Sequence, residues 1–149
     1  MARIIMIYAS MTGNTEMMAN AVAEGVREAG EDIDVVDIME GPDAHDLESY
    51  EGILLGAYTW GDGDLPDDFL DFYDEMSNIQ LIEKKAAVFG SCDSAYPNFG
   101  AAVDILMEKL SEQGAQVYPE GLKIELTPGD DELETCRSFG KKFVDFLRT

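Results

Sequence analysis

The fold of this chain is decided by the stretch Ile4-Ile5-Met6-Ile7-Tyr8-Ala9-Ser10-Met11-Thr12-Gly13-Asn14-Thr15, in which an apolar run leads directly into a segment with helical spacing. A strand that turns sharply into a helix presents unpaired main-chain N–H groups at the positive end of the helix dipole. Gly13 lets the main chain approach a ligand without a Cβ, and neutral side-chain donors come from Ser10, Thr12, Asn14 and Thr15. No lysine or arginine occurs among residues 4–26. The stretch therefore predicts a site for one phosphate held by neutral donors.

Two other phosphate-binding loops do not occur in the sequence. The pattern Gly-x-x-x-x-Gly-Lys-Ser/Thr of nucleoside triphosphatases is absent, and Gly61-Asp62-Gly63 has Pro66 where the third glycine of Gly-x-Gly-x-x-Gly would fall. A polar helix cap that binds nothing is the alternative interpretation of residues 10–15. Several donors within six positions, at the end of a buried type of strand, favour the phosphate site.

The charge of the chain narrows the kinds of partner that it can bind. The 149 residues include 31 acidic and 10 basic side chains, for a formal net charge of −21, which excludes nucleic acid and anionic membrane surfaces as partners. Seven acidic residues crowd into one segment: Asp62, Asp64, Asp67, Asp68, Asp71, Asp74 and Glu75. Two interpretations stay open for this segment, a solvated face or a surface that steers a basic partner toward the ligand site.

Cysteine and histidine usage points to the cytoplasm and away from metal or nucleophilic chemistry. Cys92 and Cys136 match no metal or redox motif, and His45 stands alone in a loop-like stretch. No run of about 18 apolar residues could span a membrane. Because the first predicted strand starts at residue 3, we expect no signal peptide. We therefore expect a reduced cytoplasmic protein without a metal site.

Apolar runs alternate with helical patterns along the chain. Strands are predicted at 3–8, 33–38, 52–58, 86–90 and, with an interruption, 115–126, and helices fill the intervals. Such alternation predicts a single α/β domain over residues 1–149 with a five-stranded, doubly wound parallel sheet. Asp34 and Asp37 within the second strand, and full alternation at 122–126, indicate that the second and fifth strands are edges. The order 2-1-3-4-5 follows, and it places a ligand site at the loops 9–15, 58–66 and 91–99.

One large aromatic side chain lies on each of the second and third loops. Trp60 and Tyr96 stand among glycine, hydroxyl and acidic residues, where a role in the core is not expected. Two rings that face a cleft from different loops form a slot for a planar ring. Alternatively, each ring merely covers the ends of the strands. Their coincidence with a phosphate loop favours a planar phosphate ester as the ligand.

These three loops resemble those of flavodoxins. The resemblance rests on Ser-x-Thr-Gly-Asn-Thr at residues 10–15, Thr-Trp-Gly-Asp-Gly at residues 59–63 and Phe-Gly-Ser-Cys-Asp-Ser-Ala-Tyr at residues 89–96. It extends over nearly the whole chain, and the absence of a long insertion in 115–126 resembles the short-chain branch. FMN at the switch point of the 2-1-3-4-5 sheet is a known property of that family, not a deduction from this sequence.

The resemblance implies non-covalently bound FMN. Its phosphate would lie on residues 10–15, which include Met11, with Thr59 nearby. Trp60 and Tyr96 would cover the two faces of the ring, and Gly61-Asp62-Gly63 would meet its N5/O4 edge. The pyrimidine end and the ribityl chain would meet the remaining expected residues: Ser91, Cys92, Asp93, Phe99 and Gly100. One departure from many relatives is Tyr58, which stands where they have a small hydroxyl residue.

The resemblance also implies a low-potential one-electron carrier rather than a stand-alone catalyst. FMN would cycle between semiquinone and hydroquinone, and a flip of the Gly61-Asp62 peptide would favour the semiquinone. The expected partners of this monomer are a flavodoxin reductase and an acceptor enzyme, both basic at the contact face and bound weakly and transiently.

Three alternative functions fit the sequence less well. A phosphoacceptor signalling domain needs carboxylates after the first and third strands, where this chain has Ala9-Ser10 and Thr59-Trp60. An FMN-dependent quinone reductase needs extra loops over the flavin, and the compact loops leave no surplus chain for them. A calcium buffer is the weakest alternative, because Asp62-Gly63-Asp64 lacks the downstream ligands of a calcium loop.

Overall fold

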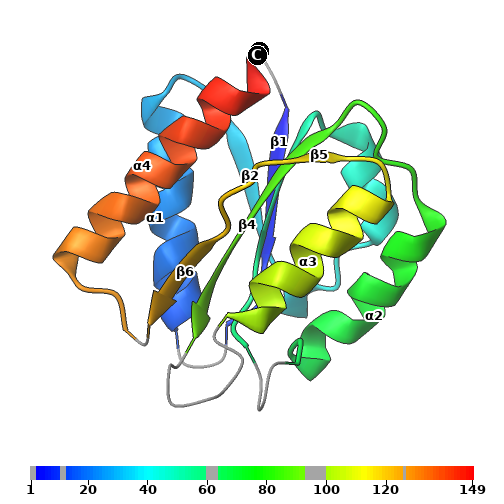
Figure 1. Cartoon of the computed structure of the whole chain (residues 1–149), viewed down its shortest axis with the longest axis horizontal. Coiled ribbons are helices and arrows are strands. Elements are labelled where there is room, and N and C mark those ends of the chain that lie inside the picture. The colour runs from blue at the N-terminus through cyan, green and yellow to red at the C-terminus, as the bar shows by residue number, and fades with distance from the viewer. Residues whose placement is uncertain (1–2, 11–12, 60–63, 93–99, 126) are drawn as a thin grey trace.

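The computed structural model describes residues 3–10, 13–59, 64–92, 100–125 and 127–149 (Figure 1). Its strands form a sheet of the order β2-β1-β3-β4-β5, in which every pair is parallel and β6 also pairs with β4. β5 pairs with the start of β4 and β6 with its end, so the two short strands share the fifth position. The predicted order and the predicted interruption of the last strand are both confirmed. The strands are β1 (Ile4–Tyr8), β2 (Ile33–Asp37), β3 (Gly52–Gly56), β4 (Lys85–Cys92), β5 (Gln116–Val117) and β6 (Leu122–Glu125).

Several strand ends differ from the prediction; β3, for example, stops at Gly56 rather than at residue 58. β4 continues past residue 90 to Cys92, because Phe89–Cys92 pair with β6. β2 stops at Asp37, whose carboxylate accepts a hydrogen bond from the Met39 N–H and begins the 3-10 helix η1 (Ile38–Glu40). A second 3-10 helix, η2 (Ala44–Ser49), leads on to β3. The sequence patterns predicted neither of these 3-10 helices.

Burial separates the central strands from the edges as the sequence predicts. Every residue of β1 and β3 is buried, and so is β4 apart from its first residue. In β2 only Ile33 is buried, and in β6 only Ile124. Strands buried on both faces need continuous apolar sequence, whereas edge strands tolerate charge.

Helices cover both faces of the sheet, with α1 and α4 on one face and α2 and α3 on the other (Figure 1). Successive strand residues alternate between these two layers: Ile4 and Met6 pack with α1 and α4, whereas Ile5 and Ile7 pack toward α2 and α3. This alternation is the period of two that a pleated strand imposes. The helices are α1 (Asn14–Glu28), α2 (Asp67–Glu75), which continues into the 3-10 helix η3 (Met76–Asn78), α3 (Ala101–Glu112) and α4 (Asp130–Leu147).

Glycine allows α1 and α4 to pack with their main chains in close contact. A Cβ added to Gly140 of α4 would lie 2.2 Å from the carbonyl oxygen of Val22. A Cβ added to Gly25 of α1 would lie 2.0 Å from the carbonyl oxygen of Arg137. Each helix therefore presents a glycine to the main chain of the other, and the layer over this face depends on both.

The carboxyl ends of the strands and the N-termini of α1 and α3 meet at one edge of the sheet, the lower edge in Figure 1. β1 lies between β2 and β3, so the chain direction across the sheet reverses there. The Ala9 N–H continues the ladder past β1 by donating to the Gly56 carbonyl at 2.9 Å. The loops after β1 and β3 therefore diverge from adjacent points at this edge, which is where doubly wound sheets bind ligands.

The two cysteines are buried, whereas the histidine is exposed. Cys92 and Cys136 are both free and buried, and burial raises the pKa of Cys136 to about 11. The exposed His45 is the second residue of η2 rather than a loop residue, and its imidazole pairs with Asp43 at 3.0 Å. That pairing raises the pKa of His45. Within the described ranges, no helix is long and apolar enough to cross a membrane.

Candidate functional site

The N-terminus of α1 presents main-chain donors at the carboxyl edge of the sheet. Gly13 precedes the helix with φ of +90°, a main-chain conformation that residues with a side chain rarely adopt. A Cβ added to Gly13 would meet open space. The hydroxyl of Ser10 accepts a hydrogen bond from the Glu16 N–H at 3.1 Å. Among the described residues, no group accepts a hydrogen bond from the N–H groups of Asn14 and Thr15, and Gly13 has no side chain that could cap the helix. Orphaned donors beside a helix dipole fit a phosphate monoester.

Tyr8 and Glu16 tie the end of β1 to this helix. The Tyr8 hydroxyl donates to a carboxylate oxygen of Glu16 at 3.1 Å. Burial, followed by this hydrogen bond and the charge of Glu16, raises the pKa of Tyr8 to about 12. The folded protein therefore holds the neutral phenol more firmly than the unfolded chain does.

This shift predicts a specific loss of stability in alkaline solution. The unfolded chain releases the Tyr8 proton near pH 10 and the folded chain only near pH 12, so the stabilisation is present below pH 10 and is lost between these values. In Tyr8→Phe, the free energy of unfolding should fall less steeply from pH 9 to pH 11 than in the wild type. Urea titrations across this range measure both slopes, and parallel curves would contradict the role of Tyr8.

A chain of hydrogen bonds joins the ends of the three predicted loops. The hydroxyls of Thr15 and Ser91 lie 2.7 Å apart, although the residues are 76 positions apart in the sequence, and both side chains are buried. The Thr59 N–H donates to the Ser91 carbonyl at 3.3 Å. The structure therefore brings Thr15, Thr59 and Ser91 together, one from each loop that the sequence singled out.

Thr59 also stabilises the first turn of α3 (Ala101–Glu112). Its hydroxyl accepts a hydrogen bond from the Ala102 N–H at 3.2 Å, so this side chain supports the helix start. Gly100 precedes α3 with φ of +67° and is buried. A Cβ there would lie 2.4 Å from the side chain of Lys123, whose ammonium pairs with Asp104 at 3.0 Å. The main-chain conformation of Gly100 therefore favours glycine, and the Lys123 side chain would have to move to admit a Cβ.

Ser91 and Cys92, expected in the third loop, are strand residues in the structure. They belong to β4 because β6 pairs with them. The Cys92 thiol donates to the Ile124 carbonyl of β6 at 3.5 Å, so its side chain faces the edge strand. Tyr58 is half-buried against the layer formed by α2 and α3, and burial raises its pKa, with further contributions from Asp68 and Asp67.

Part of the predicted site lies outside the described residues. This applies to both aromatic rings of the expected slot and to the peptide expected to flip, and these predictions therefore stay predictions. The residues concerned are Met11, Thr12, Trp60, Gly61, Asp62, Gly63, Asp93, Tyr96 and Phe99.

Thr127 is a residue at this edge that the sequence patterns did not single out. Its hydroxyl donates to Oδ1 of Asn14 at 3.0 Å, across 113 positions of sequence. Its position in the sequence could have identified it, because residue 127 follows the predicted last strand, which ends beside β4. The same rule that selected the other three loops would have selected this one.

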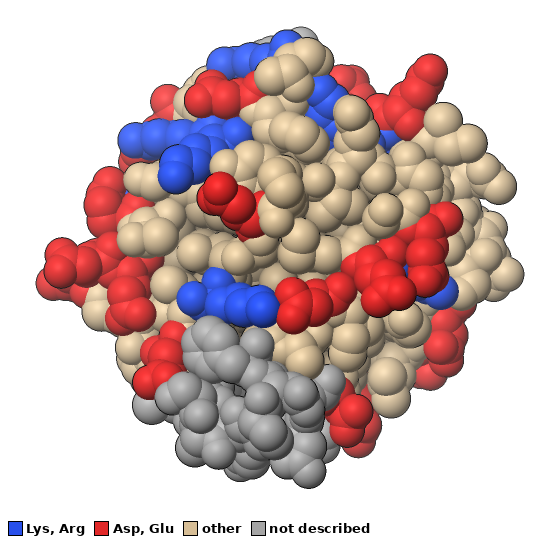
Figure 2. Space-filling view, in the orientation of Figure 1, with Lys and Arg blue, Asp and Glu red and all other residues tan. Residues whose placement is uncertain are grey.

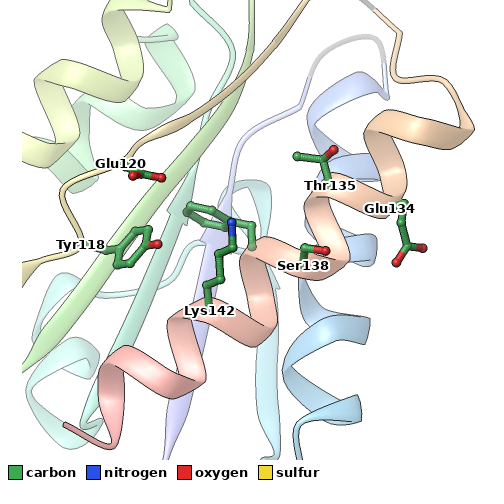
Figure 3. A pocket seen from close by; sticks show the side chains of 7 residues that line it. Tyr118, Glu120, Glu134, Thr135, Ser138 and Lys142 are labelled. Carbon is green, nitrogen blue, oxygen red and sulfur yellow. The ribbon is translucent and has the colours of Figure 1, made fainter.

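A cavity of about 280 Å³ lies away from this edge, between α4 and the segment that joins β5 to β6 (Figure 3). Tyr118 and Glu120 border it on one side, and Ser138 and Lys142 of α4 border it on the other. None of its lining residues is among those predicted to bind a ligand. In the part of the chain that the structure describes, no cluster of three His, Cys, Asp or Glu could hold a metal ion.

Comparison with known proteins agrees with this architecture. The family model for flavodoxin matches residues 6–140. The chain is 48% identical over 145 residues to probable flavodoxin 1 of Bacillus subtilis, covering 97% of this chain and 91% of that protein. It is 37% identical over 147 residues to a flavodoxin of Maridesulfovibrio salexigens, covering 97% and 99%.

A solved structure extends the likeness to three dimensions. The crystal structure of oxidised flavodoxin 1 from Bacillus cereus superimposes with a TM-score of 0.94 at 63% identity, covering 97% of this chain and 98% of that one. Flavodoxins are FMN-binding proteins of electron transport. The family match over most of the length, and relatives covered almost completely, show that this chain belongs to the flavodoxin family.

Proposed function

We propose that this protein is a low-potential one-electron carrier whose non-covalently bound FMN cycles between semiquinone and hydroquinone. The observation that supports this best is the cluster of Thr15, Thr59 and Ser91, beside N–H groups of α1 that have no partner among the described residues. It joins the three loops that would hold the phosphate, the ring and the ribityl chain. FMN supplies one-electron chemistry when bound, and the chain supplies binding, orientation and electrostatics.

The residues at the start of α1 would hold the phosphate. The helix dipole and the N–H groups of Asn14 and Thr15, for which the described part of the chain offers no acceptor, favour an anion without a basic side chain. The buried Thr15 hydroxyl is already paired with Ser91, so the main chain of Thr15 is the better placed donor. Gly13 leaves open space where a Cβ would stand.

Trp60 and Tyr96 would cover the two faces of the ring and exclude water from it. Stacking adds dispersion, and a dry site disfavours an added negative charge on the flavin. In Tyr96→Ala we expect weaker FMN binding and a less negative reduction potential, because the ring becomes more accessible to water. Fluorescence titration measures the affinity and potentiometry measures the potential. Wild-type affinity in this variant would remove Tyr96 from the site.

The net charge of −21 should lower the potential of the last electron transfer. A unit charge about 10 Å away costs roughly 0.8 kcal/mol at an effective dielectric constant near 40. About 1.4 kcal/mol corresponds to roughly 59 mV for one electron, so several carboxylates shift the potential by on the order of 100 mV.

Added salt tests this contribution, because it screens charges that lie far apart in solvent. The potential of the semiquinone/hydroquinone couple should rise when ionic strength is increased from about 0.01 M to about 1 M, over which the screening length falls from roughly 30 Å to roughly 3 Å. A potential that does not move with salt would show that the long-range charges do not tune it.

The partners of this carrier are proposed to be a reductase and an acceptor enzyme with basic contact faces. Figure 2 shows Asp and Glu side chains around most of the visible face, and Lys and Arg side chains mainly near the end of the molecule where α4 terminates and again near the middle of the face. The acidic residues of α2 are exposed: Asp67, Asp68, Asp71, Asp74 and Glu75. A groove of about 420 Å³ runs between α2 and α3, with Leu70 and Ile105 in its wall and Asp64 and Asp67 at its rim.

Charge reversal tests this docking face. Asp67→Lys should slow electron transfer to a basic acceptor such as cytochrome c several-fold at low salt, because it weakens electrostatic steering. The matched control is Asp145→Lys on α4, an equally exposed carboxylate far from the groove. Stopped-flow rates measured across a range of salt concentrations compare the two variants. Equal slowing in both would mean that net charge, rather than this face, governs the encounter.

A further inference from the structure

We propose that Thr127 is a positioning residue, which holds the amide of Asn14 so that its N–H group faces the phosphate. The proposal rests on the proposed function, because it concerns the site where the phosphate of FMN would lie. Its starting point is the hydrogen bond from Thr127 Oγ1 to Asn14 Oδ1 at 3.0 Å. This bond joins the segment after β6, the strand at the edge of the sheet, to the first residue of α1.

The direction of this hydrogen bond decides what Asn14 can offer to an anion. An asparagine amide carries an acceptor oxygen and an NH2 group with two donors. Because the threonine hydroxyl donates to the oxygen, the NH2 group remains available as a donor. In the flipped orientation the NH2 group would be used by Thr127, and the oxygen would point toward the phosphate. The hydroxyl and a bound phosphate therefore favour the same orientation of the amide.

Thr127 is itself held in place by its neighbours. Pro128 is buried next to it, and proline fixes its own φ and restricts the residue before it. The Gly129 N–H donates to the carboxylate of Glu132 at 3.0 Å, which fixes the start of α4. An exposed asparagine alone has a broad choice of side-chain orientation. A fixed hydroxyl removes part of the entropy cost of ordering Asn14 when the ligand binds.

The surroundings of the pair are consistent with a role in orientation rather than in stability. Thr127 is exposed and Asn14 is partly exposed, so the hydrogen bond between them contributes little to the folded state. Both side chains are neutral and cannot bind phosphate by charge. What the pair supplies is a donor aimed in a defined direction, which matters only when an acceptor is present.

Flavin titrations of the full-length protein, stripped of flavin, test this proposal. Thr127→Val removes the hydroxyl at nearly constant shape, and Thr127→Ser keeps it. We expect the dissociation constant for FMN to rise about threefold to tenfold in the valine variant, the loss typical of one hydrogen bond, and to stay near the wild-type value in the serine variant. Riboflavin, which has no phosphate, should bind the wild type and both variants equally. Quenching of flavin fluorescence measures all of these constants.

A second substitution tests whether Thr127 acts through Asn14. In an Asn14→Ala background, Thr127→Val should cause no further loss of FMN affinity, since the amide that it orients is absent. Two independent, additive losses would overturn the proposal, and so would an equal loss of riboflavin affinity in Thr127→Val, which indicates a general structural effect. Unfolding midpoints of the flavin-free proteins show whether any variant is damaged.

The titrations also separate failure of this proposal from failure of the proposed function. If the wild type binds FMN tightly and Thr127→Val binds it equally well, only the role of Thr127 is wrong. If the wild type binds neither FMN nor riboflavin, both proposals are wrong. If the wild type binds both flavins equally well, the phosphate site at α1 is wrong and the role of Thr127 falls with it.

Discussion

Gly140→Ala is expected to lower the free energy of unfolding by on the order of 3 kcal/mol, near the upper end for overpacking of a core. The added Cβ would lie 2.2 Å from the Val22 carbonyl oxygen and 3.0 Å from the Val26 nitrogen. These are main-chain atoms of α1, so they cannot rotate away as a side chain would. The two helices would have to separate, and the apolar residues between them and the sheet would lose contact.

Elsewhere in a helix the same change usually stabilises, since alanine is about 1 kcal/mol better than glycine in a helix interior. At Gly140, packing alone therefore decides whether the substitution raises or lowers the free energy of unfolding. Gly25→Ala should have a similar effect, because its Cβ would lie 2.0 Å from the Arg137 carbonyl oxygen. The control is Gly129→Ala, where φ is −84° and the nearest contact of the added Cβ is a flexible carboxylate oxygen of Glu132 at 3.7 Å.

Urea unfolding followed by far-UV circular dichroism measures these effects at equal flavin content. The control should lose no more than about 1 kcal/mol, because Gly129 precedes α4 as its N-cap, where alanine is less favourable than glycine. Wild-type stability in both Gly140→Ala and Gly25→Ala would contradict the close packing of α1 and α4.

Asn14→Asp is expected to weaken FMN binding about a thousandfold. The substitution keeps the shape of the side chain and still accepts the hydrogen bond from Thr127, but it replaces the NH2 donor by an anionic oxygen. Two like unit charges about 4 Å apart repel by roughly 4 kcal/mol at an effective dielectric constant near 20. About 1.4 kcal/mol is tenfold in affinity, so this repulsion corresponds to roughly three orders of magnitude.

The fold itself should survive Asn14→Asp, because an acidic residue in the first turn interacts favourably with the helix dipole. Asn14→Ala serves as the neutral control and should lose only the contribution of its hydrogen bond, about tenfold. Retention of FMN through gel filtration, followed by fluorescence titration, distinguishes the variants. An aspartate variant that keeps its flavin as firmly as the alanine variant would place the phosphate away from Asn14.

Much of the fold follows from local sequence. The apolar runs of β1, β3 and β4 could be recognised as central strands because both of their faces are buried, and Asp34 and Asp37 marked β2 as an edge. The 3-10 helices between β2 and β3 could not be predicted in this way. They depend on caps such as that of Asp37, and a short acidic stretch does not reveal them.

The site follows from sequence less completely. The clustering of Thr15 with Ser91 agrees with the convergence of loops that the sheet order predicts. Two contacts depend on residues that lie far apart in the sequence. One is the hydrogen bond between the Thr59 hydroxyl and the first turn of α3, and the other is the contact of Thr127 with Asn14. The pattern of residues within a short stretch of sequence cannot predict such contacts. Ser91 and Cys92 were expected in a loop because their pairing with β6 is also a long-range contact.

The most direct test of the account is the visible spectrum of the purified protein during stepwise reduction with dithionite. We predict a yellow protein that turns blue through the long-wavelength absorption of a neutral semiquinone and then bleaches, in two separate one-electron steps. A colourless protein that takes up no added FMN would contradict the account. A flavin that bleaches in a single two-electron step would contradict the proposal of one-electron transfer.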